Sequence, residues 1–137
     1  MKTPRIVTAF RLAAWLAQVV PARPGAMAAR TMGRIVGYMD GDRRRIVEKT
    51  LRRSRSADLG GAEMRRSVDA VFASYADYYF HSFRLPAMTP DQVIDGFTEE
   101  GYELIAEARE AGNGVIMAMP QLGSWEWLAH WLTLRHD

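Results

Sequence analysis

The residues best suited to chemistry lie in one short stretch, from Gln121 to Glu126, at the junction of two patterns. Before it, Val115–Met119 is a wholly apolar run bounded by glycine and proline, which predicts a buried strand that ends in a turn. After it, from Trp125 onward, apolar residues recur at helical spacing. In α/β proteins the carboxyl end of a strand, next to the first turn of a helix, is the usual place for ligands and chemistry.

The side chains of this junction set limits on the chemistry. Glu126 places a carboxylate in the first helical turn, where the helix dipole favours negative charge and where it can orient an imidazole base. Gln121 can hold a hydroxyl by hydrogen bonds, but its neutral carboxamide cannot accept the proton as a base. At 100° per residue the two positions lie about 140° apart on a helix, so they meet only if Gln121 precedes the helix. His130 is either a partly exposed helix residue or a weak substitute base that points away from the turn.

The run P-Q-L-G-S-W-E resembles the first motif, His-x4-Asp/Glu, of the bacterial lauroyl/myristoyl acyltransferases of lipid A synthesis and of the related phosphatidylinositol mannoside acyltransferases. Gly123, Trp125 and Glu126 fit this pattern, whereas Ser124 replaces the usual asparagine. Gln121 stands where the family has its catalytic histidine.

A second run, Ser74–Pro86 (S-Y-A-D-Y-Y-F-H-S-F-R-L-P), is similar to a run of the mannoside acyltransferases. The two runs, in this order, form a fairly specific signal. The resemblance covers the whole chain but only the amino-terminal half of the family's length. It implies that Tyr75, Tyr79 and Arg84 lie near the catalytic turn and bind substrate, with the Arg84 guanidinium suited to phosphate. The other interpretation of Arg84 is a cation that faces the dipole of its own helix.

The resemblance implies transfer of a long acyl chain from acyl-CoA to a hydroxyl of a membrane glycolipid, either a phosphatidylinositol mannoside or a lipid A-type acceptor. Acyl-CoA is then a co-substrate, and no other cofactor is expected. The reaction belongs on the cytoplasmic face of the inner or plasma membrane, with the protein peripheral or monotopic. Glu126 is the orienting carboxylate, Gly123 and Trp125 shape the turn, and Ser124 and Trp125 bind substrate. Since loss of a general base costs on the order of 10²–10⁴ in rate, Gln121 predicts an impaired enzyme.

Two other functions compete with this one. The first is a non-catalytic, membrane-associated helical module that binds lipid or a partner. It is favoured by Gln121 and by the lack of further predicted strands that could form a sheet with Val115–Met119. The basic stretch Arg30–Arg66, with eleven Lys or Arg against five acids, is a solvated face, a contact for anionic headgroups or donor phosphates, or a nucleic-acid contact. It has no regular series of interleaved aromatic residues and no recognised DNA-binding motif, so we expect no nucleic-acid partner.

The apolar segment Ile6–Val20, interrupted by Thr8, Arg11 and Gln18, predicts a helix of about 22 Å, too short to span a bilayer. It fits a helix lying in the headgroup region, a helix packed in the core, or a cleaved signal peptide. Pro21 and Pro24 are predicted to end it.

Further helices are predicted over Ala26–Met39, Arg43–Arg53, Ala62–Phe83 and Thr98–Ala111. A short helical turn is predicted over Asp91–Gly96, with Thr89 as its cap. The Ala26–Met39 helix offers five large apolar side chains for burial, Met27, Met32, Ile35, Val36 and Met39. Ala62–Phe83 carries a stripe that is either core or a substrate groove, Val68, Val71, Phe72, Tyr75, Tyr79 and Phe83. Thr98 is the predicted N-cap of the last helix before the strand.

Composition narrows the class of protein. With 48% apolar and 25% charged residues the chain is globular in type. It has no cysteine, so disulfides and thiolate metal sites are excluded, and its three histidines are not spaced as metal ligands. We therefore expect no metal.

Together these elements predict an α/β fold, the mainly helical amino-terminal half of a lysophospholipid-acyltransferase-like fold. It carries the first strand of a central sheet, and the remainder of the sheet is absent. We treat 1–137 as a single partial domain, with a possible membrane-associating helix (1–24), a helical region (25–113) and a strand–turn–helix (114–137). Because one strand cannot form a sheet, we expect the chain to be the amino-terminal fragment of a protein of about twice its length.

Overall fold

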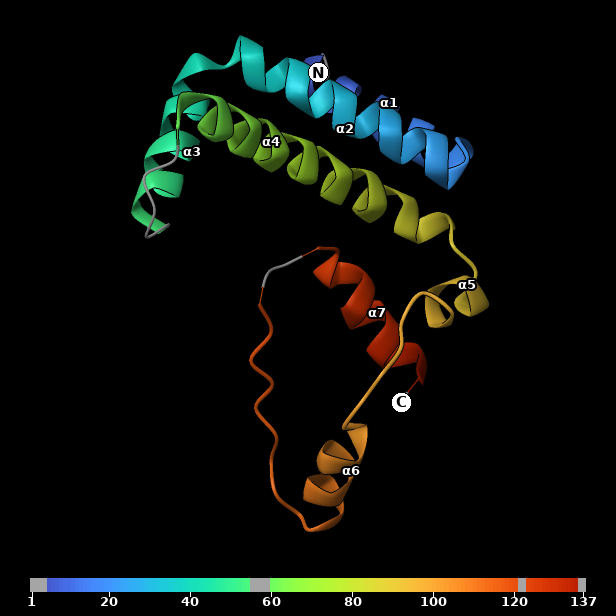
Figure 1. The fold of residues 1–137 in the computed structure, drawn as a ribbon. Coiled ribbons are helices and arrows are strands. Elements are labelled where there is room, and N and C mark those ends of the chain that lie inside the picture. The colour runs from blue at the N-terminus through green and yellow to red at the C-terminus, as the bar shows by residue number, and fades with distance from the viewer. Residues whose placement is uncertain (1–4, 55–59, 121–122, 136–137) are drawn as a thin grey trace. The chain divides into compact units, whose positions relative to one another are not determined.

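The structure is a computed structural model that describes residues 5–54, 60–120 and 123–135. The chain divides into two compact units, Met1–Ala87 and Met88–Asp137. The first contains α1 (Arg5–Val19), α2 (Ala22–Met39), α3 (Gly41–Ser54), α4 (Gly61–Arg84) and the 3₁₀ turn η1 (Leu85–Ala87). The second contains α5 (Pro90–Ile94), α6 (Tyr102–Glu110) and α7 (Trp125–Arg135) (Figure 1).

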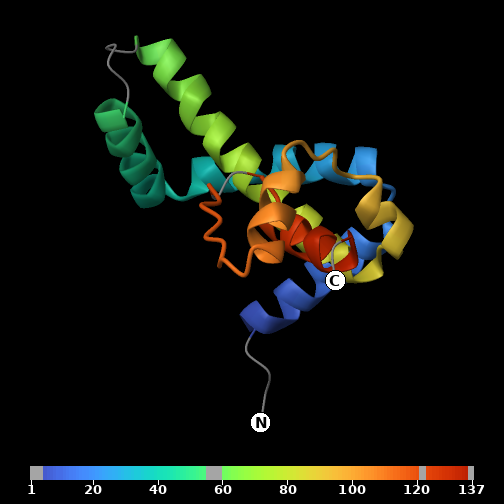
Figure 2. The same cartoon turned by 90° about the horizontal axis from the view of Figure 1, so that it is seen from below.

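The long helix α4 organises the first unit, because α1, α2 and α3 each pack against it. α2 runs antiparallel along α4 (Figure 1), and α1 also packs against α4. α3 lies beside the amino-terminal part of α4 (Figure 2). One core cluster, at the α1 end, joins Ala17 and Ala26 to Phe80. A second, at the α3 end, joins Met64 and Val68 to Val47, Leu51 and Phe72.

The contact between α2 and α4 is made by small residues of α2. Gly25, Gly33 and Gly37, spaced in multiples of four, are all buried, and residues four apart lie on one helix face. A Cβ at Gly33 would lie 2.4 Å from the backbone oxygen of Phe72, and one at Gly37 would lie 2.6 Å from the Phe72 ring. The two backbones therefore approach closely because α2 presents hydrogen atoms where other residues carry side chains.

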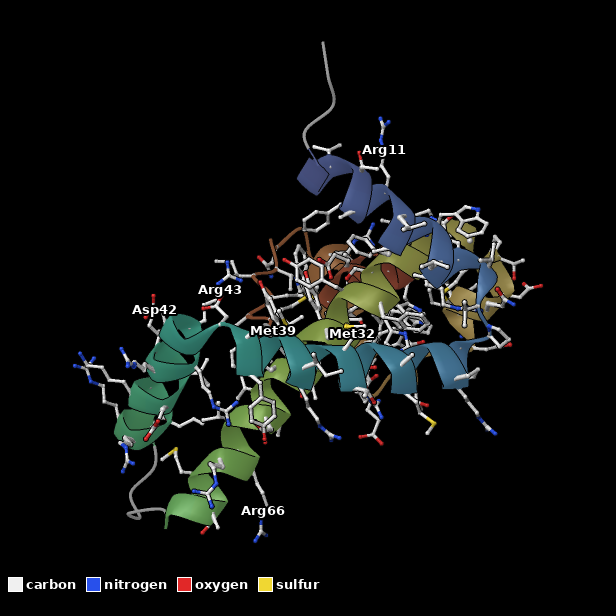
Figure 3. All side chains as sticks on the ribbon, turned by 90° about the horizontal axis from the view of Figure 1, so that it is seen from above. Arg11, Met32, Met39, Asp42, Arg43 and Arg66 are labelled. Atoms are coloured by element: carbon white, nitrogen blue, oxygen red, sulfur yellow. The ribbon has the colours of Figure 1, made fainter. Side chains whose placement is uncertain are left out.

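This packing corrects the predicted burial of α2. Its large apolar residues are exposed instead, at 68% for Met27, 59% for Met32, 48% for Ile35 and Val36, and 82% for Met39. The prediction that the large apolar residues are buried is wrong, because the glycine face of α2 permits a closer contact with α4. The large side chains are left on the outside, Met32 and Met39 among them (Figure 3).

The predicted break between the first two helices is also corrected. α2 begins at Ala22, so Pro24 lies inside its first turn instead of in a linker. A first-turn proline is tolerated because the amide hydrogen it lacks has no partner in the helix. The other break is at Asp40, whose carboxylate accepts a hydrogen bond from the Arg43 amide at the start of α3.

α4 spans Gly61–Arg84, which confirms the helix predicted over Ala62–Phe83. Its predicted apolar stripe is only partly buried. Val68 is 2% exposed, but Tyr75 is 56% exposed. The buried side of α4 is rotated toward Ala73 and Phe80, because α2 and α1 pack there.

The second unit confirms one predicted cap and corrects another. Thr89 caps α5 in a complete capping box with Gln92. α6 begins at Tyr102 with Gly101 as its N-cap, so Thr98 is not the N-cap. Gly101 has φ of +79°, a left-handed conformation that glycine adopts without steric cost and that no helix continues through.

The strand predicted over Val115–Met119 is not formed. Residues 113–120 have no regular structure and 111–120 are exposed, with Ile116 98% exposed. A strand needs a neighbour to pair its backbone groups, and the described part of the chain contains no strand. The helical part of the predicted fold is confirmed, whereas its sheet is absent from these residues.

Candidate functional site

The turn before α7 is set by Gly123, whose φ is +64°. This left-handed conformation suits glycine and separates the preceding segment from the helix. Ser124 follows at the N-cap position, where its carbonyl accepts hydrogen bonds from the amides of Trp127 (3.0 Å) and Leu128 (3.3 Å). The predicted turn at Gly123 and the helix after it are thus confirmed.

Glu126 lies in the first turn of α7 and is half-buried. Its carboxylate is therefore at the positive end of the helix dipole, as expected from the sequence. Ser124, also half-buried, and Trp125, which is 37% exposed, are its near neighbours in the chain. Three of the predicted site residues are thus grouped at the amino terminus of one helix.

Two tryptophans of α7 hold this helix on α5. The indole Nε1 of Trp127 donates to the carbonyl of Val93 (3.1 Å), and that of Trp131 donates to the carbonyl of Ile94 (3.2 Å). Both carbonyls belong to the last turn of α5, where a helix leaves carbonyls without intrahelical partners. Phe97 packs against both indoles, with ring centroids 5.9 and 5.8 Å apart. The orientation of Glu126 therefore depends on a helix that is anchored by its aromatic face.

Gln121, the residue at the predicted base position, lies outside the described residues. His130 is exposed on α7. The Thr133 hydroxyl donates a hydrogen bond to the His130 carbonyl (2.8 Å), a contact that involves the backbone of His130 and not its ring. The role of the imidazole as a weak substitute base stays a prediction.

Tyr75 and Tyr79 are brought together on α4 in the first unit. Their hydroxyls are 3.2 Å apart and their ring centroids 5.0 Å apart. The aromatic series continues along α4 to Phe83 (5.7 Å from Tyr79) and from there to Phe10 of α1 (6.0 Å). These tyrosines and the residues around Glu126 belong to different units.

Arg84 is placed at the end of α4, where it binds α1 instead of the end of its own helix. Its Nη1 donates to the carbonyls of Ala17 (3.1 Å) and Val20 (2.6 Å). In a continuous helix these two oxygens would accept from the amides of residues 21 and 24, and both positions are proline. Arg84 thus supplies the donors that Pro21 and Pro24 lack.

A sequence model of one protein family, "Bacterial lipid A biosynthesis acyltransferase", matches residues 2–137 of this chain. The chain belongs to this family. The resemblance seen in the motifs is thereby confirmed.

Two curated proteins are similar to part of the chain. A phosphatidylinositol mannoside acyltransferase of Mycolicibacterium smegmatis is 34% identical over 65 residues, which cover 47% of this chain and 21% of that protein. A phosphatidylinositol mannoside acyltransferase of Mycobacterium tuberculosis is 34% identical over 74 residues, which cover 49% of this chain and 22% of that protein. The matched segment thus spans about a fifth of the length of these relatives. No solved structure matches the chain.

In the described residues of this chain, the family motif consists of the turn at Gly123 and the start of α7 at Trp125. In the described ranges, no helix is long and apolar enough to cross a membrane, and no group of three or more His, Asp or Glu is arranged to hold a metal ion.

Sequence reasoning missed the ion pairs that tie α4 to its neighbours. Arg30 pairs with Asp77 (3.0 Å), and Arg44 pairs with Asp69 (2.8 Å) while its guanidinium lies over the Tyr38 ring (4.7 Å). The partners are far apart in the chain, so no local spacing marks them. The role of Trp127 and Trp131 as hydrogen-bond donors was missed as well, although their spacing of four was a visible signal.

Proposed function

We propose that this protein is an acyltransferase that moves a long-chain acyl group from acyl-CoA to a hydroxyl of a membrane glycolipid, either a phosphatidylinositol mannoside or a lipid A-type acceptor. The observation that carries the proposal is the family match over residues 2–137, together with a motif that begins a helix at Trp125. The two mannoside acyltransferases that resemble the chain support the glycolipid acceptor.

The reaction joins the acceptor hydroxyl oxygen to the thioester carbonyl carbon and breaks the carbon–sulfur bond. The thiolate of coenzyme A leaves, and the hydroxyl proton passes to a base and then to the thiolate. Glu126 is the residue that orients the base, since a carboxylate fixes the tautomer of an imidazole and stabilises the imidazolium. Ser124 and Trp125 contact the substrate beside it.

Gln121 occupies the base position, and its carboxamide binds the acceptor hydroxyl without accepting the proton. We therefore expect the protein to transfer acyl groups slowly. Replacement of Gln121 by histidine restores an imidazole at neutral pH and is expected to raise kcat/KM by about 10²–10⁴-fold. The assay measures transfer from a long-chain acyl-CoA to a phosphatidylinositol mannoside or a lipid A precursor.

Two controls separate the base from the site around it. Gln121→Asn retains a neutral carboxamide and should leave the low rate unchanged. Adding Glu126→Gln to Gln121→His should reverse most of the gain, because the new imidazole loses its orienting carboxylate. If the histidine variant keeps its helical circular dichroism and transfers nothing to either acceptor, the catalytic proposal fails.

That outcome would favour a second function, which the carboxamide at Gln121 specifically supports. The protein would then be a non-catalytic, membrane-associated helical module that binds lipid or a partner. We also propose that the protein acts at the cytoplasmic face of the plasma or inner membrane as a peripheral or monotopic protein. Acyl-CoA is supplied on that side, and the exposed apolar residues of α1 support a helix that lies in the headgroup region.

A further inference from the structure

Three side chains on one side of α7 bind the segment of the second unit that precedes α6. Trp127, Trp131 and Arg135 recur every four residues, and this spacing places them on one stripe of the helix. The two indoles donate to the carbonyls that end α5, and the Arg135 Nε lies 3.5 Å from a carboxylate oxygen of Glu99. These contacts extend along about 12 Å of helix, so they fix the rotation of α7 about its axis as well as its position.

The contact nearest the start of α7 depends on Gly96, which follows the C-cap of α5. A Cβ added at Gly96 would lie 2.4 Å from Cζ2, 2.9 Å from Cε2 and 3.2 Å from Nε1 of Trp127. The Gly96 amide also donates to the Val93 carbonyl (3.3 Å), the oxygen that accepts the Trp127 bond (3.1 Å). The indole is therefore seated on the backbone of a glycine, and any other residue at position 96 would displace it.

The residue directly before this indole in the chain is Glu126. Successive residues of an α-helix lie 100° apart, so Glu126 lies on a different side of α7 from Trp127, although it shares the same helical turn. Rotation of the helix about its axis therefore moves both side chains together. The end of a side chain lies about 5–6 Å from the axis of its helix, so a rotation of about 10° moves the Glu126 carboxylate by about 1 Å.

We propose that Gly96 and Trp127 are positioning residues for Glu126. The indole, seated on the glycine and bonded to the Val93 carbonyl, sets the direction in which the carboxylate points. This inference rests on the proposed function, in which the carboxylate orients the base. A misplacement of about 1 Å can cost about 10²-fold in rate, so a contact that controls the rotation of α7 also controls the rate of transfer.

A double-mutant cycle in the Gln121→His protein tests this link. The variants are Gly96→Ala, Glu126→Gln and the two together, and acyl transfer is measured as kcat and KM. We expect Gly96→Ala to lower kcat about tenfold with KM nearly unchanged, because an orienting carboxylate acts on the chemical step. In the presence of Glu126→Gln the same change should cost less than about twofold, since no carboxylate is left to misplace.

Two further variants separate this effect from a general loss of stability. Gly114→Ala is the matched control, because a Cβ at Gly114 meets nothing within 4 Å and the residue lies in the same unit. It should leave kcat unchanged. Trp127→Phe removes the indole donor but keeps an aromatic ring, and its cost should show the same dependence on Glu126. Circular dichroism checks that each variant is helical at the assay temperature.

A spectroscopic measurement tests the same contact without acyl transfer. The ¹³C resonance of the Glu126 carboxylate is assigned in the 137-residue chain by its loss in Glu126→Gln. Gly96→Ala should shift this resonance together with the indole Nε1–H resonance of Trp127, because the added methyl group displaces the ring and turns the helix. Gly114→Ala should shift neither.

Either of two results would overturn the proposal. One is that Gly96→Ala costs nothing, or costs equally with and without the Glu126 carboxylate, which would make the contact a purely structural one. The other is an unchanged Glu126 resonance in Gly96→Ala. If the resonance shifts while the Gln121→His protein transfers no acyl group, the positioning of Glu126 is upheld and the proposed function alone fails.

Discussion

At the scale of single residues, Arg84 shows how a side chain with functional chemistry can be used for the fold. Its guanidinium was expected to bind phosphate, but in the structure Nη1 binds the Ala17 and Val20 carbonyls of the α1 end. These oxygens need an external donor because the residues four positions later are Pro21 and Pro24. Phosphate binding by Arg84 stays a prediction, and the structural role gives it a competing explanation.

Replacing Arg84 distinguishes the two roles. Arg84→Met should lower the free energy of unfolding by about 1–3 kcal/mol, because two part-buried carbonyls lose their donor. Arg84→Lys should lose less, since an ammonium can still bond to one oxygen. Urea denaturation measures both variants, with Arg109→Met on exposed α6 as control. Unchanged stability combined with loss of acyl transfer would instead support phosphate binding.

At the scale of elements, the α2–α4 pair depends on the absence of side chains. Gly33 lies against the backbone oxygen of Phe72 and the Cβ of Ala76, at 2.4 and 2.7 Å from the position of an added Cβ. Neither atom can turn away as a flexible side chain would. By contrast, the nearest neighbour of Gly25 is the Phe80 ring, which can rotate.

Gly33→Ala should therefore destabilise the protein by about 1–3 kcal/mol, even though alanine is the better helix former. The control is Gly41→Ala at the start of α3, where an added Cβ meets nothing within 4 Å. That variant should be neutral or slightly stabilising. Thermal unfolding followed by circular dichroism compares the two. Equal melting temperatures of the two variants would contradict the close packing of α2 on α4, in which an added Cβ at Gly33 lies 2.4 Å from the Phe72 oxygen.

The elements also show what sequence can and cannot predict here. Local signals succeeded for α4, for the Thr89 capping box and for the start of α7 after Gly123, because each depends on neighbouring residues. They failed for the buried face of α2, which is decided by how closely α4 approaches. They failed again at Val115–Met119, where apolar composition predicted a strand that only a partner strand can complete.

In the candidate site, too, features that depend on neighbouring residues were predictable, whereas features that depend on distant partners were not. The grouping of Ser124, Trp125 and Glu126 at a helix start was predictable from spacing. The anchoring of that helix by Trp127 and Trp131 was not, because it requires the two carbonyls at the end of α5. The spacing of four places both indoles on one side of the helix, but it does not identify the carbonyls that they bind.

At the scale of the whole molecule, charge is divided between the two units. Residues 1–87 carry sixteen Lys or Arg against seven Asp or Glu, whereas residues 88–137 carry two against nine. The small net charge of +2 conceals this difference. An anionic surface therefore attracts the first unit and repels the second.

Burial is divided between the units as well, and this leads to a prediction about their independence. The first unit contains both core clusters, the glycine contacts of α2 and the ion pairs Arg30–Asp77 and Arg44–Asp69. Among the described residues of the second unit, the buried hydrophobic side chains are Val93 and Trp131. A piece of this size with so little buried surface is marginal on its own.

A fragment of residues 1–87 should therefore remain helical and unfold cooperatively, whereas residues 88–137 should show little stable structure alone. Circular dichroism against temperature measures both fragments. Trp127→Phe and Trp131→Phe remove the indole donors to α5 and should lower the residual helicity of 88–137 further, since each deletes a bond to a helix end. A cooperative transition in 88–137 would contradict this division, because its α5–α7 contact would then suffice for a stable fold. Loss of structure in 1–87 would show instead that α4 needs the second unit to hold α1 and α2 in place.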